Sequence, residues 1–268
     1  MKNGICSHEC KKPTLNSLYH YCTICGILTP SDNSDIPQLT KPTKYNNKPE
    51  EDPFIAIYQL CSENSKKNNE LEKVSILYLN ERKLCIDFLK YLSAIFKLST
   101  KTFFFAIKVL DTLMLKYNPE TRREIYLAVL VSLIISNKYS SENYKSIKLE
   151  KLLNAHGEFS YTTQEIALAE VESIKALNYE LNFQTLFDIL YLMINCGIIF
   201  KEEVDNLKGN AVEESVYSFC LCVLMKIIET PLLFIYNEYI IAFSIIYLSR
   251  RQHNLSKNYF QYLKDIFK

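Results

Sequence analysis

One run of apolar residues dominates the hydropathy pattern of the chain. From Ile125 to Ile135 every position is apolar except Ser132, and the run ends near Lys138. A helix that is apolar all round must be buried on all sides. At a rise of about 1.5 Å per residue, this run is too short to cross a bilayer core of about 30 Å. We therefore predict a core helix over residues 125–138 that brings Lys138 to the edge of the core.

Helical periodicity continues on both sides of this run. Leu84, Phe88, Leu92 and Ile95 recur at helical spacing and lie on one face of a predicted helix. Two T-x-x-E capping boxes mark helix starts, one at Thr121 to Glu124 and one at Thr162 to Glu165. Other helices are predicted over residues 54–61, 103–117, 147–154, 163–181, 185–196, 211–229, 237–251 and 259–267. The pattern is typical of an all-α protein.

The order of these segments predicts four parts. Residues 1–28 contain four cysteines in two close pairs. Residues 29–70 form a largely irregular linker that is rich in Pro, Ser, Asn and charged residues. Residues 71–183 form a first helical domain, and residues 184–268 form a shorter second one. Each half has an apolar helix among polar-faced neighbours, as a duplicated fold would.

Charge and cysteine usage narrow the possible partners and compartments. The net charge of +1 comes from 31 basic and 30 acidic residues, so a general attraction to nucleic acid is not expected. The N-terminus is polar and shows no secretory signal, which argues against a disulfide framework. The prediction is a reducing compartment: cytoplasm, nucleus or a cytoskeletal or ciliary assembly. Four cysteines in apolar helical contexts are predicted to be buried thiols: Cys85, Cys196, Cys220 and Cys222.

Two close cysteine pairs near the N-terminus are candidate metal ligands. Cys6 and Cys10 form a C-x3-C pair, and Cys22 and Cys25 form a C-x2-C pair followed by glycine. Such pairs suit a tetrahedral Zn²⁺ ion with a structural role, because four protein ligands leave no open position. The stretch YCTICGIL resembles the closing knuckle of a zinc ribbon, whereas the first pair departs from the usual spacing. We favour Cys10 over His8 as the fourth ligand; the alternative is four free thiols on a disordered tail.

The helical part of the chain resembles the cyclin family. The stretch ERKLCIDFL, with Arg82, Asp87 and Phe88, is similar to the first helix of the N-terminal cyclin box. The stretches LSTKTFFFAIKVLDTLM, LVSLIISNKYSSE and YTTQEIALAEVESIKALNYELNFQT resemble later helices of the same box. The stretch LMKIIETPLLFIYNEYIIAFSIIYLSRR looks like a shortened C-terminal cyclin fold. The resemblance implies a five-helix bundle around a buried central helix, followed by a smaller bundle.

The resemblance also implies that the chain binds a cyclin-dependent protein kinase. In cyclins a lysine and a glutamate from two helices hold the backbone near the C-helix of the kinase, and here they fall on Lys138 and Glu170. The chain would then activate the kinase without chemistry of its own. The alternative is that the two charges only brace the fold. Apolar contacts are expected beside them at Tyr139, Ile174, Tyr179 and Leu181.

Three departures from the family pattern bear on the role of the chain. Ser140 and Ser141 replace an acidic pair. The substrate-docking groove needs an apolar residue before Arg82 and a large one three residues after it; Glu81 and Cys85 occupy these places, so we expect the groove to be lost. No arginine precedes Arg82, so the N-terminal part lacks an R-x-x-L destruction signal. These departures disfavour a cell-cycle cyclin that is destroyed periodically in mitosis.

Two other functions fit parts of the sequence. The chain could be a cyclin-fold structural component of a large assembly, without kinase activation. The chain could also be a transcription-initiation-factor-B-like protein, because members of that family have a zinc ribbon followed by two cyclin folds. An enzymatic function is not expected, since the sequence has no Gly-rich phosphate loop or H-E-x-x-H motif. None of His8, His20, His156 and His253 has a Cys or Ser partner at a diagnostic spacing.

Overall fold

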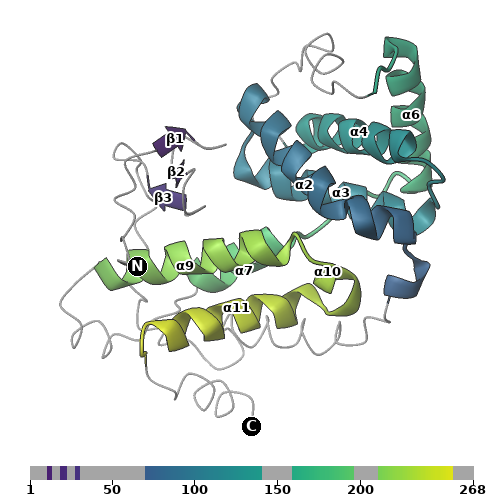
Figure 1. The fold of residues 1–268 in the computed structure, drawn as a ribbon. Helices are drawn as coiled ribbons and strands as arrows, with labels where there is room; N and C mark the ends of the chain where they lie inside the picture. Colours follow the sequence, from purple (N-terminus) through teal and green to yellow (C-terminus); the bar gives the residue numbers. More distant parts are fainter. Residues whose placement is uncertain are drawn as a thin grey trace, which may run out of the picture.

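The computed structural model describes residues 11–13, 19–22, 28–30, 70–140, 159–195 and 211–255. Helices dominate these residues, which confirms the all-α class, and a small sheet lies at the N-terminal end (Figure 1). The helices predicted over residues 54–61, 147–154 and 259–267, together with Cys196, lie outside this part of the chain. None of the described helices is both long enough and apolar enough to span a membrane.

The first half of the bundle is built around a central helix. Its elements are a 3₁₀ turn η2 (Leu71–Lys73) and the helices α2 (Ile76–Phe96), α3 (Thr100–Lys116), α4 (Arg122–Ser140) and α6 (Thr163–Ala176). Helices α2, α3 and α6 all pack against α4 (Figure 1). Ile125, Val129, Val131 and Leu133 of α4 are fully buried. The predicted core helix is therefore confirmed.

Helix α2 buries a different face from the one that the apolar spacing suggests. Leu84 and Ile95 are 49% and 41% exposed, and of the four residues in that row only Leu92 is buried. Apolar residues lie on two faces of this helix, and packing against α3 and α4 selects the face that also carries a buried arginine. The buried residues of α2 are Tyr78, Arg82, Cys85, Ile86, Leu89, Leu92 and Ser93.

The two predicted capping boxes differ in the structure. At α6 the box is complete: Thr162 Oγ1 accepts from the Glu165 N–H at 3.1 Å, and Glu165 Oε2 accepts from the Thr162 N–H at 2.7 Å. At α4 only half of the box forms. Thr121 Oγ1 accepts from the Glu124 N–H at 3.3 Å, but the Glu124 carboxylate accepts from the Glu120 N–H instead. The Glu124 carboxylate therefore satisfies a donor one residue earlier than predicted.

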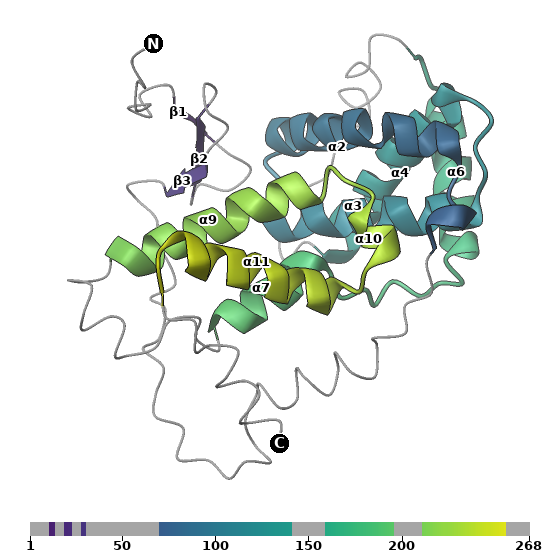
Figure 2. The ribbon, with the colours of Figure 1, turned by 60° about the horizontal axis from the view of Figure 1, so that its bottom comes forward.

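The second half consists of α7 (Leu186–Asn195), α9 (Ala211–Ile227), α10 (Leu232–Ile235) and α11 (Glu238–Gln252). Helix α11 packs against both α7 and α9 (Figure 2). The Tyr239 hydroxyl donates to Gln184 Oε1 at 2.6 Å, so α7 and α11 begin side by side. Ser249 Oγ donates to the Val216 carbonyl at 2.8 Å, which places the end of α11 beside the start of α9.

Helix α11 is less enclosed than its counterpart α4, contrary to the expected duplication. Ile240, Tyr247 and Leu248 are 44%, 41% and 45% exposed, although they belong to an almost continuously apolar stretch. Among the described elements α11 is packed chiefly by two helices, whereas three surround α4. An apolar sequence therefore produces a fully buried helix only where enough neighbours are available.

A serine and a histidine meet where α9 begins and α11 ends. Ser215 Oγ lies 2.8 Å from His253 Nε2, and His253 Nδ1 lies 2.8 Å from the Ser249 carbonyl oxygen. A carbonyl only accepts, so Nδ1 carries a proton, and in the neutral ring Nε2 accepts from Ser215. The sequence analysis found no serine partner for His253, because the two residues are distant in sequence and only the antiparallel packing brings them together.

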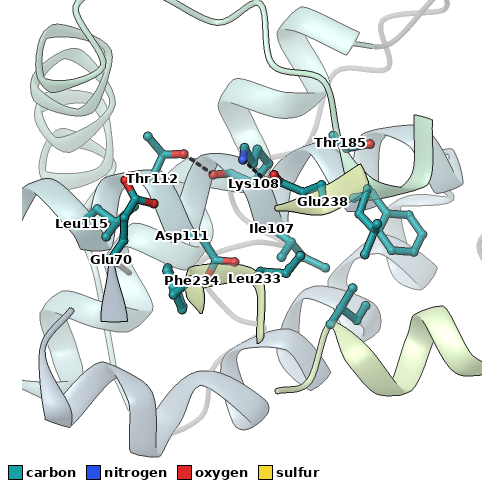
Figure 3. Close-up of a pocket in the computed structure, with 13 residues that line it drawn as sticks. Glu70, Ile107, Lys108, Asp111, Thr112, Leu115, Thr185, Leu233, Phe234 and Glu238 are labelled. Carbon is teal, nitrogen blue, oxygen red and sulfur yellow. Dashed lines mark hydrogen bonds and ion pairs between the residues drawn. The ribbon is translucent and has the colours of Figure 1, made fainter. Parts of the chain in front are cut away.

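Charged side chains join the two halves. Lys90 Nζ of α2 lies 2.7 Å from Glu229 Oε1, and Lys108 Nζ of α3 lies 2.5 Å from Glu238 Oε1. A cavity of about 40 Å³ lies at this junction, and Figure 3 shows Lys108 and Glu238 at its edge with Asp111 nearby. That volume holds roughly three water molecules. It is too small for an organic ligand.

Three short antiparallel strands form the sheet: β1 (Lys11–Pro13), β2 (Tyr19–Cys22) and β3 (Leu28–Pro30). Strand β3 lies next to α9 (Figures 1 and 2). Of the predicted metal ligands, Cys6, Cys10 and Cys25 lie outside the described residues, as does His8. No group of three or more His, Cys, Asp or Glu side chains within the described residues is arranged to hold a metal ion.

The three cysteines of the described helices are free thiols. Cys85 and Cys220 are buried, as predicted, whereas Cys222 is only half-buried. Burial raises the pKa of Cys85 to about 12 and that of Cys220 to about 11. Both thiols therefore stay protonated at neutral pH and are poor nucleophiles.

Candidate partner-binding site

Two charged residues from different helices meet at the surface of the first half. Lys138 lies at the C-terminal end of α4, and Glu170 lies in the middle of α6. The Lys138 Nζ atom is 2.5 Å from Glu170 Oε1 and 2.8 Å from Oε2, so both carboxylate oxygens accept from one ammonium group. The structure thus brings together the two residues that the sequence analysis paired.

The exposure of this pair determines how much it can contribute to stability. The Lys138 side chain is 49% exposed and that of Glu170 is 17% exposed. An ion pair this accessible to water contributes about 0–1 kcal/mol to folding, because water screens both charges. The pair therefore contributes little to the stability of the bundle, and both charged groups are partly accessible at the surface.

Tyr139 extends the same surface from the end of α4. Its side chain is 51% exposed, and its ring stacks on the buried Phe105 ring, with the centroids 5.2 Å apart. The Phe105 ring in turn contacts the Phe183 ring at 5.8 Å. One buried ring of α3 therefore supports both the exposed Tyr139 and the chain that leaves α6. Phe105 and Phe183 were not among the predicted site residues.

A Schellman motif at the end of α6 positions two further predicted contacts. The Tyr179 N–H donates to the Ile174 carbonyl at 3.0 Å, and the Asn178 N–H donates to the Lys175 carbonyl at 2.9 Å. Asn178 has φ 54°, the left-handed conformation that this motif requires at its turning residue. The motif brings the backbone of Tyr179 back against that of Ile174, one turn beyond Glu170.

Tyr179 is held in an unusual conformation. It has φ 61°, which is uncommon for a residue with a bulky side chain, and its side chain is 70% exposed. A left-handed conformation costs a non-glycine residue about 1–2 kcal/mol, and burial of the ring does not offset this cost. An exposed aromatic side chain at a strained position is the kind of feature found at functional sites.

The six predicted residues occupy one connected region. Lys138 and Tyr139 end α4, Glu170 and Ile174 belong to α6, and the segment after α6 contains the other two, Tyr179 and Leu181. Ile174 and Leu181 are half-buried and pack against the core. The region combines a charge pair with exposed aromatic rings, which is a suitable surface for binding a protein.

A lysine from α3 reinforces the end of α6. Lys116 Nζ donates to the Ala176 carbonyl at 2.6 Å, which satisfies one of the acceptors left free at the helix C-terminus. The Tyr117 hydroxyl donates to the Glu172 carbonyl at 3.3 Å. These contacts were not predicted, because a lysine at the end of a predicted helix has no recognisable partner in the sequence.

Comparison with known proteins identifies the domain that carries this region. Residues 55–182 match the cyclin N-terminal domain. The match covers just under half of the chain and includes all six predicted contact residues. No curated protein matches the sequence. The domain match supports the cyclin family, whose members are regulatory and non-catalytic.

Within the matched domain, Glu81 and Cys85 occupy the two positions to which the family resemblance assigns the substrate-docking groove. The Glu81 carboxylate of α2 lies 3.1 Å from Arg122 Nε of α4. Cys85 is fully buried beneath this pair. Neither position offers an exposed apolar side chain, and the loss of the groove stays a prediction.

Proposed function

We propose that the chain is a regulatory subunit that binds and activates a cyclin-dependent protein kinase. The observation that carries this proposal is the exposed Lys138–Glu170 pair, set within a cyclin N-terminal domain. Tyr139 follows Lys138 in α4 and Tyr179 follows α6, and both have exposed rings that would supply apolar contact area for a partner. Polar side chains with strong hydrogen-bonding capacity, bordered by exposed aromatic rings, suit recognition of an exposed backbone segment.

The proposed mechanism depends on the position of the kinase C-helix, which binding of the chain would fix. A protein kinase is active when the lysine of its third strand pairs with a glutamate of its C-helix, and the position of that helix is the controlled variable. A rigid bundle docked on the C-helix would favour the inward position. The chain would shift an equilibrium of the kinase and take no part in phosphoryl transfer.

Charge-reversal variants of Lys138 and Glu170 distinguish a role of the pair in binding the kinase from a role in stabilising the fold. K138E and E170K each destroy the pair, and each should abolish capture of the kinase from an extract. The double variant K138E/E170K restores an internal ion pair but exchanges the two charges. It should fold like the wild type and still fail to bind the kinase, because the partner would meet the opposite charges.

A second ion pair between the same two helices provides a matched control. Arg123 of α4 and Glu165 of α6 lie 2.6 Å apart and have side chains that are 44% and 38% exposed. R123M breaks this pair and leaves the capping box of α6 in place, so it should retain kinase capture and activation. Retained capture by K138E/E170K would overturn the assignment of the site, as would equal loss in K138E/E170K and R123M.

The sheet that precedes the helices supports a second candidate function. A three-stranded sheet ahead of cyclin-like helices fits the layout of a transcription-initiation-factor-B-like protein. The net charge of +1 argues against tight binding to duplex DNA, which usually requires a basic face. Tight binding to promoter DNA in a gel shift at physiological salt would favour this function over kinase binding.

Affinity purification of the chain from an extract would distinguish a structural role from kinase regulation. A cyclin-fold component of a large assembly would co-purify with scaffold proteins at constant stoichiometry and without a kinase. A regulatory subunit would recover a protein kinase whose activity on a general substrate increases when the chain is added. The described residues include three free thiols, which fit the predicted reducing compartment.

A further inference from the structure

The outward side of α11 carries an exposed row of apolar side chains. Ile240, Tyr247 and Leu248 are exposed, and Phe243 beside them is only half-buried. Their spacing of i, i+3, i+7 and i+8 places all four on one side of the helix, which we call the α11 stripe. The opposite side of α11 packs against α7 and α9. In Figure 1, α11 forms the lower edge of the described part of the chain.

The α11 stripe can be covered without leaving a polar group unpaired. Ser244 is the one polar residue that lies within it, and the Ser244 hydroxyl donates to the Ile240 carbonyl at 2.8 Å. Because this hydrogen bond is made inside the helix, the hydroxyl does not need water as an acceptor. A covering surface would therefore remove apolar area from water without breaking the hydrogen bond of Ser244.

The end of α11 turns the chain away from the helix axis and holds it against the bundle. The Leu255 N–H donates to the Arg250 carbonyl at 3.0 Å, and the Asn254 N–H donates to the Arg251 carbonyl at 3.2 Å. Asn254 has φ 54°, so these bonds form a Schellman motif. The Leu255 side chain is buried in the core. The segment that follows therefore starts beside the end of α11.

The sequence after Leu255 has an apolar face of the same length as the α11 stripe. It predicts a helix over residues 259–267, which lie outside the described residues. Nine helical residues span about 13 Å, and the stripe from Ile240 to Leu248 spans about 12 Å. A helix this short is not stable alone in water, so it needs an apolar surface to pack against. The side chains on its apolar face are Tyr259, Phe260, Tyr262, Leu263, Ile266 and Phe267.

We propose that residues 259–267 fold back as a helix and cover the α11 stripe of the same chain. Residues 256–258 would connect the two helices, and a tether this short gives an effective concentration in the millimolar range. The tether favours this segment over a second copy of the chain or a helix of another protein. The contact would give α11 a third helical neighbour, as α4 has in the first half.

This proposal does not depend on the proposed kinase binding. The α11 stripe belongs to the second half of the described helices, whereas Lys138 and Glu170 belong to α4 and α6 of the first half. Either proposal can fail without the other.

A tryptophan reporter in the full chain tests the contact. The sequence contains no tryptophan, so F260W places a single indole on the apolar face of the segment. Its emission should lie at the short wavelengths of a buried indole, and iodide should quench it weakly. Adding L248E, which places a charge on the α11 stripe, should shift the emission to longer wavelength and increase the quenching. L84E is the matched control, because Leu84 of α2 is 49% exposed and Leu248 is 45% exposed.

The L84E control should leave the emission unchanged. Three results would overturn the proposal: an indole in F260W that is fully open to iodide, an emission that L248E leaves unchanged, and equal shifts in L248E and L84E. Circular dichroism of L248E should show the helix content of its parent, apart from the loss of the short segment.

Substitutions within the segment provide a test that cannot disturb α11. L263E changes the apolar face of the predicted helix and should expose the indole of F260W, whereas Q261E changes its polar face and should not. Equal effects of L263E and Q261E would overturn the proposed orientation of the helix. Sedimentation should show a monomer, with the same emission at all protein concentrations. Burial of the indole that appears only as the concentration rises would show that a second copy covers the α11 stripe, and would overturn the intramolecular contact.

Discussion

Arg82 of α2 and Asp111 of α3 form a buried ion pair with two parallel hydrogen bonds. Arg82 Nε donates to Asp111 Oδ1 at 2.9 Å, and Nη2 donates to Oδ2 at 2.7 Å. The remaining nitrogen, Nη1, donates to the carbonyls of Ile228 and Thr230 in the turn after α9. A single guanidinium thus connects two helices of the first half to the backbone of the second.

This arrangement predicts a large cost for removing the carboxylate. D111A would leave the Arg82 charge buried without its counterion, and such changes typically destabilise a protein by about 3–5 kcal/mol. Urea unfolding followed by circular dichroism should show this loss. The control K90M breaks the more exposed pair with Glu229 and should cost less than about 1 kcal/mol. Similar losses in the two variants would contradict the assigned role of the buried pair.

Features of the fold that depend on neighbouring residues in the sequence could be predicted, whereas features that depend on distant residues could not. The apolar run of α4 and the capping box of α6 are properties of adjacent residues, so the sequence identified both. The buried face of α2 depended on Arg82 finding Asp111, which is 29 residues away in sequence. Periodicity alone cannot choose between two apolar faces when the choice is made by a distant partner.

The same distinction applies to the candidate site. Lys138 and Glu170 were paired through the resemblance to cyclins, and the structure places them in contact. The supporting ring of Phe105 was not predicted, because a run of three phenylalanines in α3 does not show which ring lies beneath Tyr139. Kinase binding by this surface remains a prediction.

Two buried serines should respond oppositely to replacement by alanine. Ser132 Oγ of α4 is buried and has no hydrogen-bond partner among the described residues. S132A removes this unsatisfied hydroxyl and should stabilise the protein by about 1 kcal/mol. S249A removes the donor to the Val216 carbonyl between α11 and α9 and should destabilise it by about the same amount. Thermal unfolding of both variants under the same conditions measures the two effects.

Tyr179 allows stability and binding to be changed in opposite directions. Glycine adopts positive φ without the steric cost that Tyr179 bears, so Y179G should gain up to about 1 kcal/mol of stability. The same change removes an exposed ring from the proposed binding surface and should weaken kinase capture. N178G removes the steric cost of the left-handed conformation at the neighbouring residue, which has φ 54°, and keeps the Tyr179 ring. Capture that weakens equally in N178G and Y179G would show that the ring makes no contact.

The capping box of α6 predicts a specific response to acid. The pKa of Glu165 falls from its ordinary value of 4.5 to about 2, first because the carboxylate accepts from the Thr162 N–H and then because Arg123 donates to it. A lowered pKa means that ionised Glu165 stabilises the fold above pH 4.5 and that this contribution disappears as the pH falls toward 2.

E165Q should therefore be less stable than the wild type at neutral pH, and the difference should shrink toward zero near pH 2. Nuclear magnetic resonance titration of the Glu165 carboxyl should give a midpoint near 2 in the wild type. In R123M the midpoint should be higher, because one of the three donors is lost. A wild-type midpoint of 4.5 would show that the carboxylate does not hold these hydrogen bonds in solution.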